Sequence, residues 1–170
     1  MLKVKVDLIS YGYWVRSDQF FAGEYPGKTN TESLRERIDR LILAGITAFI
    51  DLTEANECLL PYSGLLKTAS YQRFPIKDFS IPRSKETTVA ILNAIDYHIE
   101  ARGMVYLHCM GGVGRTGMIV GCWLARNGNK GESPLIELQK LWNLCPKSNN
   151  RRSPETYEQE QYILKWEESK

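Results

Sequence analysis

The segment His108–Gly117, HCMGGVGRTG, restricts the fold of this 170-residue chain more than any other feature. The apolar residues 104–107 precede it, and residues 116–127 after it have the composition of a buried helix. A glycine-rich loop between a strand and a helix lets backbone amides approach an anion closely. In open α/β sheets, ligands bind at the carboxyl ends of strands. The segment is therefore predicted to be an anion-binding loop at the end of a central strand.

The rest of the chain alternates between strand and helix patterns. We expect strands at residues 46–52, 71–76 and 104–107, and helices at residues 31–44, 84–102, 116–127, 133–144 and 154–166. This order predicts one α/β domain over residues 1–170, with a mostly parallel central sheet flanked by helices. The turn-like segment AGEYPG, residues 22–27, is interpreted as structural and without chemistry.

Composition and charge limit the possible partners. The formal net charge of +2 gives no indication of nucleic-acid binding, and the apolar run at residues 118–125 is too short to span a bilayer. The N-terminal residues lack a signal-peptide core. The four cysteines have neither paired nor zinc-like spacing. We expect a cytoplasmic protein without metal or organic cofactor, whose oligomeric state the sequence does not predict.

Three kinds of phosphate loop compete for the glycine-rich segment. Gly112, Gly114 and Gly117 spell GxGxxG, but a dinucleotide site needs a second strand that ends in an acidic residue about 20 residues later. That region, residues 131–139, has a helical pattern instead. A nucleoside-triphosphate loop needs Lys followed by Ser or Thr after its last glycine, where this chain has Met118 and Ile119. The dinucleotide loop is therefore disfavoured, and the nucleoside-triphosphate loop is excluded.

The third kind, Cys-x5-Arg, fits at every position. The amides of residues 110–115 can surround one tetrahedral anion above the sulfur of Cys109. The candidate amides belong to Met110, Gly111, Gly112, Val113, Gly114 and Arg115. Arg115 can hold two phosphate oxygens, and the start of the following helix favours a thiolate. Thr116 can donate a hydrogen bond to the sulfur, and His108 is expected to orient the loop.

These residues resemble the signature of the cysteine-dependent protein tyrosine and dual-specificity phosphatase superfamily. The segment FPIKDFSIP, residues 74–82, is similar to that family's mobile acid loop and places Asp78 at the position of the general acid. A poor leaving group needs such a proton donor for chemical reasons as well. The loop lacks the tryptophan of the tyrosine-specific branch, which implies the compact dual-specificity branch.

A further segment resembles the family more weakly. In SPETYEQEQYI, residues 153–163, Glu155 stands where the family's water-positioning glutamine would fall, and Gln159 is a second glutamine. The alternative interpretation of Glu155 is an ordinary acidic residue of a first helical turn. The basic pair at residues 151–152 is expected to lie in a solvated loop, with a place on the substrate rim as the alternative.

Other reactive side chains receive structural interpretations. Cys122 and Cys145 are expected to be buried and inert. Cys58 is hypothesised to form a reversible disulfide with Cys109 under oxidation. The aspartates expected to be merely solvated are Asp39, Asp51 and Asp96.

The sequence thus predicts a phosphatase that acts through a thiophosphate intermediate. Met110 and Val113 give the loop an apolar rim that suits a phosphotyrosine ring, with Lys77 as a nearby cation. Phosphoinositide branches of the resembled family place lysines at such rim positions. Phosphoprotein is therefore the expected substrate. The same chemistry on a phosphoinositide, a nucleotide or an RNA end, and a non-catalytic phosphate-binding module, are the open alternatives.

Overall fold

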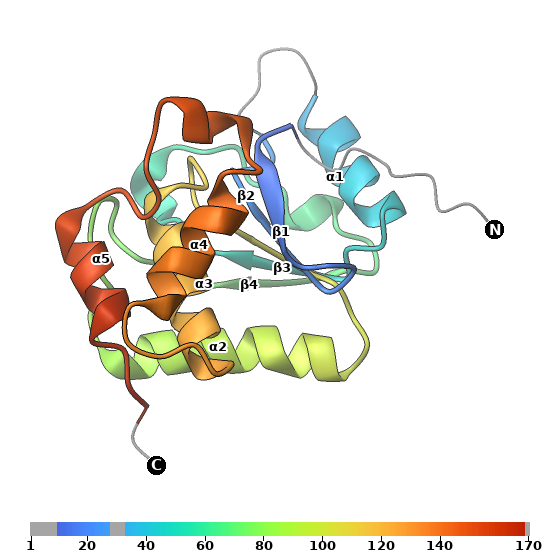
Figure 1. The fold of residues 1–170 in the computed structure, drawn as a ribbon. Helices are drawn as coiled ribbons and strands as arrows, with labels where there is room; N and C mark the ends of the chain where they lie inside the picture. Colours follow the sequence, from blue (N-terminus) through green and yellow to red (C-terminus); the bar gives the residue numbers. More distant parts are fainter. Residues whose placement is uncertain (1–9, 28–32, 169–170) are drawn as a thin grey trace.

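The computed structural model describes residues 10–27 and 33–168. A five-stranded sheet with the order β1-β2-β5-β3-β4 forms its centre (Figure 1). The strands are β1 (Gly12–Arg16), β2 (Phe20–Gly23), β3 (Ala48–Asp51), β4 (Ser70–Arg73) and β5 (Val105–His108). Only β1 runs antiparallel to its neighbour, so the sheet is mostly parallel as predicted.

The strand register aligns four residues at the carboxyl edge of the sheet. Gly23 of β2 pairs with His108 of β5, His108 pairs with Asp51 of β3, and Asp51 pairs with Arg73 of β4. Parallel strands place their carboxyl ends on the same edge, and ligands bind beside that edge. The loop that begins at Cys109 therefore starts from the middle of a row of polar and glycine residues.

Successive strand residues point to opposite faces of the sheet, and each face is covered. One face contributes Phe20, Ala22, Ala48, Ile50, Val105 and Leu107 to a core with the helices that follow β4. The other contributes Phe21, Phe49 and Tyr106 to a core with the first helix. Figure 1 shows that helix, α1, on the far side of the sheet from α2–α5.

The helices are α1 (Leu34–Leu43), α2 (Lys85–Glu100), α3 (Gly114–Arg126), α4 (Ser133–Trp142) and α5 (Tyr157–Leu164). Ser33 and Glu36 form a capping box at the start of α1, and the Ser84 side chain caps α2 as predicted. Short 3-10 turns occur at Ala55–Glu57, Ser63–Leu65 and Pro146–Asn149.

The predicted fold class is confirmed, while several boundaries differ. Residues 31–32 of the first predicted helix lie outside the described residues. The last helix begins at Tyr157 rather than at residue 154, because Thr156 supplies the N-cap. The segment at residues 22–27 is only partly a turn, since its first two residues complete β2. Both β1 and β2 lacked predicted boundaries.

Candidate active site

Cys109 follows directly after the central strand β5, and its side chain is buried. The Gly112 amide donates a hydrogen bond to Cys109 Sγ at 3.3 Å. Helix α3 begins at Gly114, so the positive end of its dipole faces the same loop. An anion that enters this loop therefore meets backbone N–H groups above a sulfur atom.

The loop holds its amides inward because its carbonyl groups are bonded from outside. Four loop carbonyls accept hydrogen bonds from groups outside the anion-binding side. The Cys109 carbonyl accepts from His108 Nδ1 (3.2 Å), that of Met110 from the Tyr25 amide (3.1 Å), that of Gly111 from Lys147 Nζ (2.7 Å) and that of Val113 from Ser153 Oγ (2.8 Å). A peptide plane whose C=O points outward directs its N–H toward the other side. The four bonds thus hold the loop in a shape whose N–H groups could face a single anion.

Gly112 is required by both conformation and space. Its φ of +70° lies in the left-handed region, and a Cβ there would stand 2.5 Å from the backbone carbon of Gly23. The loop packs so closely against the end of β2 that no side chain fits between them.

Arg115 is buried and lies in the first turn of α3. Glu57 accepts two hydrogen bonds from its guanidinium, at 2.5 Å from Nη1 and 3.0 Å from Nη2. Nη1 also donates to the Ile76 carbonyl at 2.9 Å. Burial alone would lower the pKa of Arg115, but Glu57, Cys109 and Asp78 raise it overall, so the side chain stays cationic.

Asp78 reaches this arginine from the loop that follows β4. Its Oδ1 lies 2.9 Å from Arg115 Nη2, and it accepts a hydrogen bond from the Phe79 amide at 3.1 Å. The Asp78 side chain is 41% exposed, whereas that of Arg115 is 1% exposed. A phosphate oxygen held by Arg115 would consequently lie within reach of a carboxyl group that solvent can also reach.

His108 is fully buried behind the cysteine, and its ring has a defined protonation state. Burial lowers its pKa, so the ring is neutral near pH 7. Nδ1 faces the Cys109 carbonyl, which can only accept, and Nε2 lies 2.5 Å from the Tyr62 hydroxyl. The proton is therefore on Nδ1, and Tyr62 donates to Nε2.

The comparisons with known proteins agree with this geometry. A family model described as "Polymorphic toxin system, DSP-PTPase phosphatase" matches residues 23–129. The chain belongs to this family. The matched range of the DSP-PTPase includes Glu57, Asp78 and the whole Cys109–Arg115 loop.

Curated relatives match in sequence. The candidate tyrosine phosphatase 067L of Invertebrate iridescent virus 3 is 31% identical over 131 residues, which cover 75% of this chain and 51% of the viral protein. The uncharacterised protein MJ0215 of Methanocaldococcus jannaschii is 30% identical over 92 residues, or 54% of this chain and 52% of that protein. The DSP-PTPase chain thus spans about half the length of the curated relatives it matches.

Solved structures share the fold at low identity. Tk-PTP in its active form superposes with a TM-score of 0.73 at 22% identity, covering 90% of this chain and 93% of that one. PTPMT1 in complex with PI(5)P superposes with a TM-score of 0.70 at 16% identity, covering 91% and 92%. These likenesses show that the DSP-PTPase has the fold of tyrosine-phosphatase-like enzymes.

Gln159 of the DSP-PTPase is buried and joins three segments. Its Oε1 accepts from the amides of Glu155 (3.1 Å) and Thr156 (3.2 Å), and its Nε2 donates to Ser80 O (3.1 Å). A Cβ at Gly114 would lie 2.9 Å from Gln159 Oε1. The side chain therefore connects α5 to the Asp78 loop beside the phosphate loop.

The remaining predicted site residues take varied positions. Glu155 forms an ion pair with Arg151, and its Cβ lies close to Gly114, at 3.1 Å from the position that a Cβ at Gly114 would take. Lys77 is exposed on the Asp78 loop. The Thr116 hydroxyl is buried and makes no hydrogen bond with the described residues, so the predicted bond to the sulfur is absent here.

Three sequence-based interpretations are wrong. Asp51 is fully buried rather than solvated, because Thr53, Tyr71 and Arg73 supply it with hydrogen bonds. Burial would raise the pKa of Asp51, but neighbouring His108 and the hydrogen bonds from Thr53 and Tyr71 lower it overall. Asp96 accepts from Trp123 Nε1 and Arg126. The side chain of Val113 is buried in the core and is no part of a rim.

The interpretations of the cysteines have different outcomes. Cys122 and Cys145 are buried as predicted, and burial raises the pKa of both thiols. Cys58 is exposed and Cys109 buried, and both are free thiols. A disulfide between them stays a prediction.

Sequence reasoning missed the side chains that hold the loop from behind. Lys147, from the turn after α4, donates to Gly111 O and pairs with Glu24 at 2.7 Å. Glu24 is buried and also pairs with Arg37 at 3.2 Å. These residues stand far apart in the chain and match no motif, so only the sheet topology reveals them.

We expect Lys147→Met to weaken catalysis by loosening Gly111. A hydrogen bond to a charged group contributes about 1.5–3 kcal/mol, so kcat/KM for an aryl phosphate should fall roughly tenfold to a hundredfold. Inorganic phosphate should inhibit less well by a similar factor. Lys147→Arg should restore part of both losses.

Lys140→Met is the matched control, because Lys140 is exposed and its ammonium pairs with Glu137 at 3.2 Å, on the same helix. Equal kinetics in the two methionine variants would refute the role given to Lys147.

Two further findings concern the described residues alone. No group of three or more His, Cys, Asp or Glu side chains in residues 10–27 and 33–168 is arranged to hold a metal ion. No helix in that part of the chain has the length and apolar character needed to cross a bilayer.

Proposed function

We propose that this DSP-PTPase hydrolyses phosphate monoesters through a thiophosphate intermediate on Cys109, with phosphotyrosine in proteins as its main substrate. The observation that carries the proposal is the meeting of three groups. Asp78 lies 2.9 Å from Arg115, and the Gly112 amide, in the same loop as Arg115, points at Cys109 Sγ from 3.3 Å.

In the first step, the thiolate of Cys109 attacks phosphorus, an S–P bond forms and the ester P–O bond breaks. The leaving oxygen takes a proton from the carboxylic acid form of Asp78. Arg115 and the amides of residues 110–115 stabilise the charge that gathers on the phosphoryl oxygens. The alcohol or phenol then leaves.

In the second step, a water molecule attacks the phosphorus of the intermediate. Asp78, now a carboxylate, accepts a proton from this water, the S–P bond breaks and inorganic phosphate forms. The thiolate is regenerated and the acid is protonated again, so the cycle needs no other reactant. The hydrogen bond from Gln159 Nε2 to the Ser80 carbonyl supports this step, because it fixes the Asp78 loop against α5.

Phe79 and Met110 support phosphotyrosine as the substrate. Phe79 follows the acid directly and is 58% exposed, and Met110 is half-buried in the phosphate loop. An aromatic ring in that position can pack against the ring of phosphotyrosine, which contributes about 0.5–1.5 kcal/mol beyond area burial. Phosphoserine is too short to use that contact.

Hydrolysis of a non-protein phosphate is the second candidate, favoured by one observation. The structurally similar PTPMT1 has been crystallised with PI(5)P. The exposed Lys77 is one cation that could meet a second phosphate group.

A panel of substrates separates these proposals. Peptides of one sequence carrying phosphotyrosine, phosphoserine or phosphothreonine are compared with phosphoinositides and nucleotides, with a chelator present. We expect kcat/KM to be highest for phosphotyrosine and lowest for a trisphosphorylated inositol lipid. A higher value for that lipid than for every phosphotyrosine peptide would reverse the assignment.

A further inference from the structure

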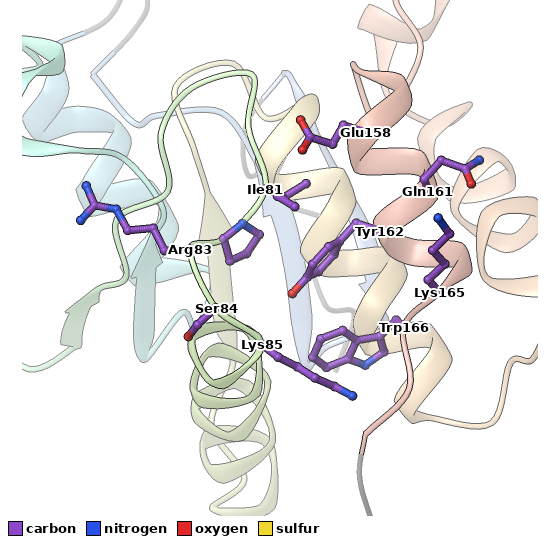
Figure 2. A pocket seen from close by; sticks show the side chains of 10 residues that line it. Ile81, Arg83, Ser84, Lys85, Glu158, Gln161, Tyr162, Lys165 and Trp166 are labelled. Atoms are coloured by element: carbon purple, nitrogen blue, oxygen red, sulfur yellow. The ribbon is translucent and has the colours of Figure 1, made fainter.

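A pocket of about 440 Å³ lies between the end of the Asp78 loop and α5 (Figure 2). None of Cys109, Asp78 and Arg115 lines it. Ile81 lies on one side of the pocket and Tyr162 and Trp166 on the other, and Pro82 also lines it. The Tyr162 hydroxyl is bonded to Thr88 at 2.7 Å, which leaves the ring face as the wall surface.

Cations surround these apolar walls. Lys85 Nζ lies 5.6 Å from the centre of the Trp166 ring, and Lys165 precedes that tryptophan directly after the end of α5 (Figure 2). Both lysines are exposed and form no ion pair with any residue the structure describes. Arg83 is a third lining cation, and Glu158 is the one lining carboxylate.

Three cations and one carboxylate line the pocket. Two further carboxylates interact with Lys85: Glu86, which is exposed to solvent, and Glu168, whose two oxygens already accept hydrogen bonds from Arg126 at 2.6 and 2.8 Å. A ligand with both apolar and anionic groups therefore complements the pocket. Its aromatic part would contact Tyr162 and Trp166, and its carboxylates would meet the lysines.

The pocket is also close to the chemistry. Ile81 follows Asp78 by three residues, and three residues span at most about 11 Å. A peptide whose phosphorylated residue sits above Cys109 advances about 3.3 Å per extended residue. Peptide residues three to six positions from the phosphorylated residue can thus reach the pocket.

We propose that this pocket binds an acidic segment with an aromatic side chain in the protein substrate, a few residues from the phosphorylated tyrosine. The inference rests on the proposed function. A peptide is favoured over a free small molecule because the pocket adjoins the loop over which the substrate chain must pass. Binding there also holds Ile81 and Pro82, and with them the Asp78 loop, against α5.

The test compares phosphotyrosine peptides that differ only in the three-residue segment expected to enter the pocket, which we call the anchor. One set carries Glu-Phe-Glu three to six residues before or after the phosphotyrosine, and the matched set carries Gln-Ala-Gln. We expect the best anchored peptide to have a kcat/KM at least tenfold above its match, mainly through KM. A peptide with Glu-Ala-Glu should keep only part of that gain.

The variant Lys85→Glu/Lys165→Glu should abolish the difference between the two sets. It should leave hydrolysis of p-nitrophenyl phosphate, which cannot reach the pocket, within about twofold of the wild type. Lys130→Glu is the control, because Lys130 is exposed and lies beyond the carboxyl end of α3, at the other end of that helix from the phosphate loop.

The outcomes are distinct. Equal turnover of anchored and matched peptides, or an anchor effect that survives in the double variant, overturns the docking proposal alone. Activation of p-nitrophenyl phosphate hydrolysis by a free aromatic acid, without an anchor effect, overturns it in favour of a small effector. Failure to hydrolyse any phosphotyrosine peptide refutes the proposed function instead.

Discussion

Replacing Cys109 by serine is expected to lower the turnover of an aryl phosphate by at least about a thousandfold, or more than about 4 kcal/mol of transition-state stabilisation. Serine keeps the shape of the side chain but is a far weaker nucleophile, since its hydroxyl does not ionise near neutral pH. Steady-state rates on p-nitrophenyl phosphate measure the loss.

The same variant should keep most of its affinity for inorganic phosphate, measured by calorimetry. The anion is expected to be held by loop amides and by Arg115, and the bonds to the loop carbonyls and to the Arg115 guanidinium do not involve the sulfur. A serine variant with activity within tenfold of the wild type would show that Cys109 is not the nucleophile.

The second large effect is expected for Asp78→Asn, and it depends on the leaving group. General acid catalysis contributes about 10²–10⁴-fold, so an alkyl phosphate should lose about that factor. Nitrophenolate leaves without a proton, so kcat/KM for its ester, which reports the first step alone, should fall much less. The wild-type rate should be bell-shaped in pH with an acidic optimum, and the variant should lose the alkaline limb.

Asp39→Asn is the matched control, because Asp39 is an exposed aspartate on α1, across the sheet from the core that holds the catalytic loop. Its kinetics should equal those of the wild type. Equal losses of kcat/KM on alkyl and aryl esters in Asp78→Asn would show that Asp78 contributes structure rather than a proton.

The elements that can be predicted from this sequence are those whose signal is local. The run before Cys109 is apolar on both faces, as a central parallel strand requires, and Ser84 is a strong N-cap for α2. The Cys-x5-Arg spacing is local too, because one loop must surround one anion. These features needed no knowledge of the tertiary structure.

What the sequence does not show depends on contacts across the sheet. Asp51 resembles any acidic residue at a strand end, yet the register places it beside His108 and Arg73. Glu57 holds Arg115 from a short turn with no recognisable pattern. Val113 is buried in the core, which residue spacing alone does not reveal.

The most direct test of the thiophosphate mechanism is a quenched reaction of Asp78→Asn with p-nitrophenyl phosphate, followed by mass analysis of the protein. In this variant the first step needs no acid, while the second lacks its base, so the intermediate should accumulate. The account predicts a burst of nitrophenolate close to one equivalent, with one phosphoryl group on the peptide that contains Cys109. Steady turnover without a burst, or a phosphoryl group on another residue, would contradict it.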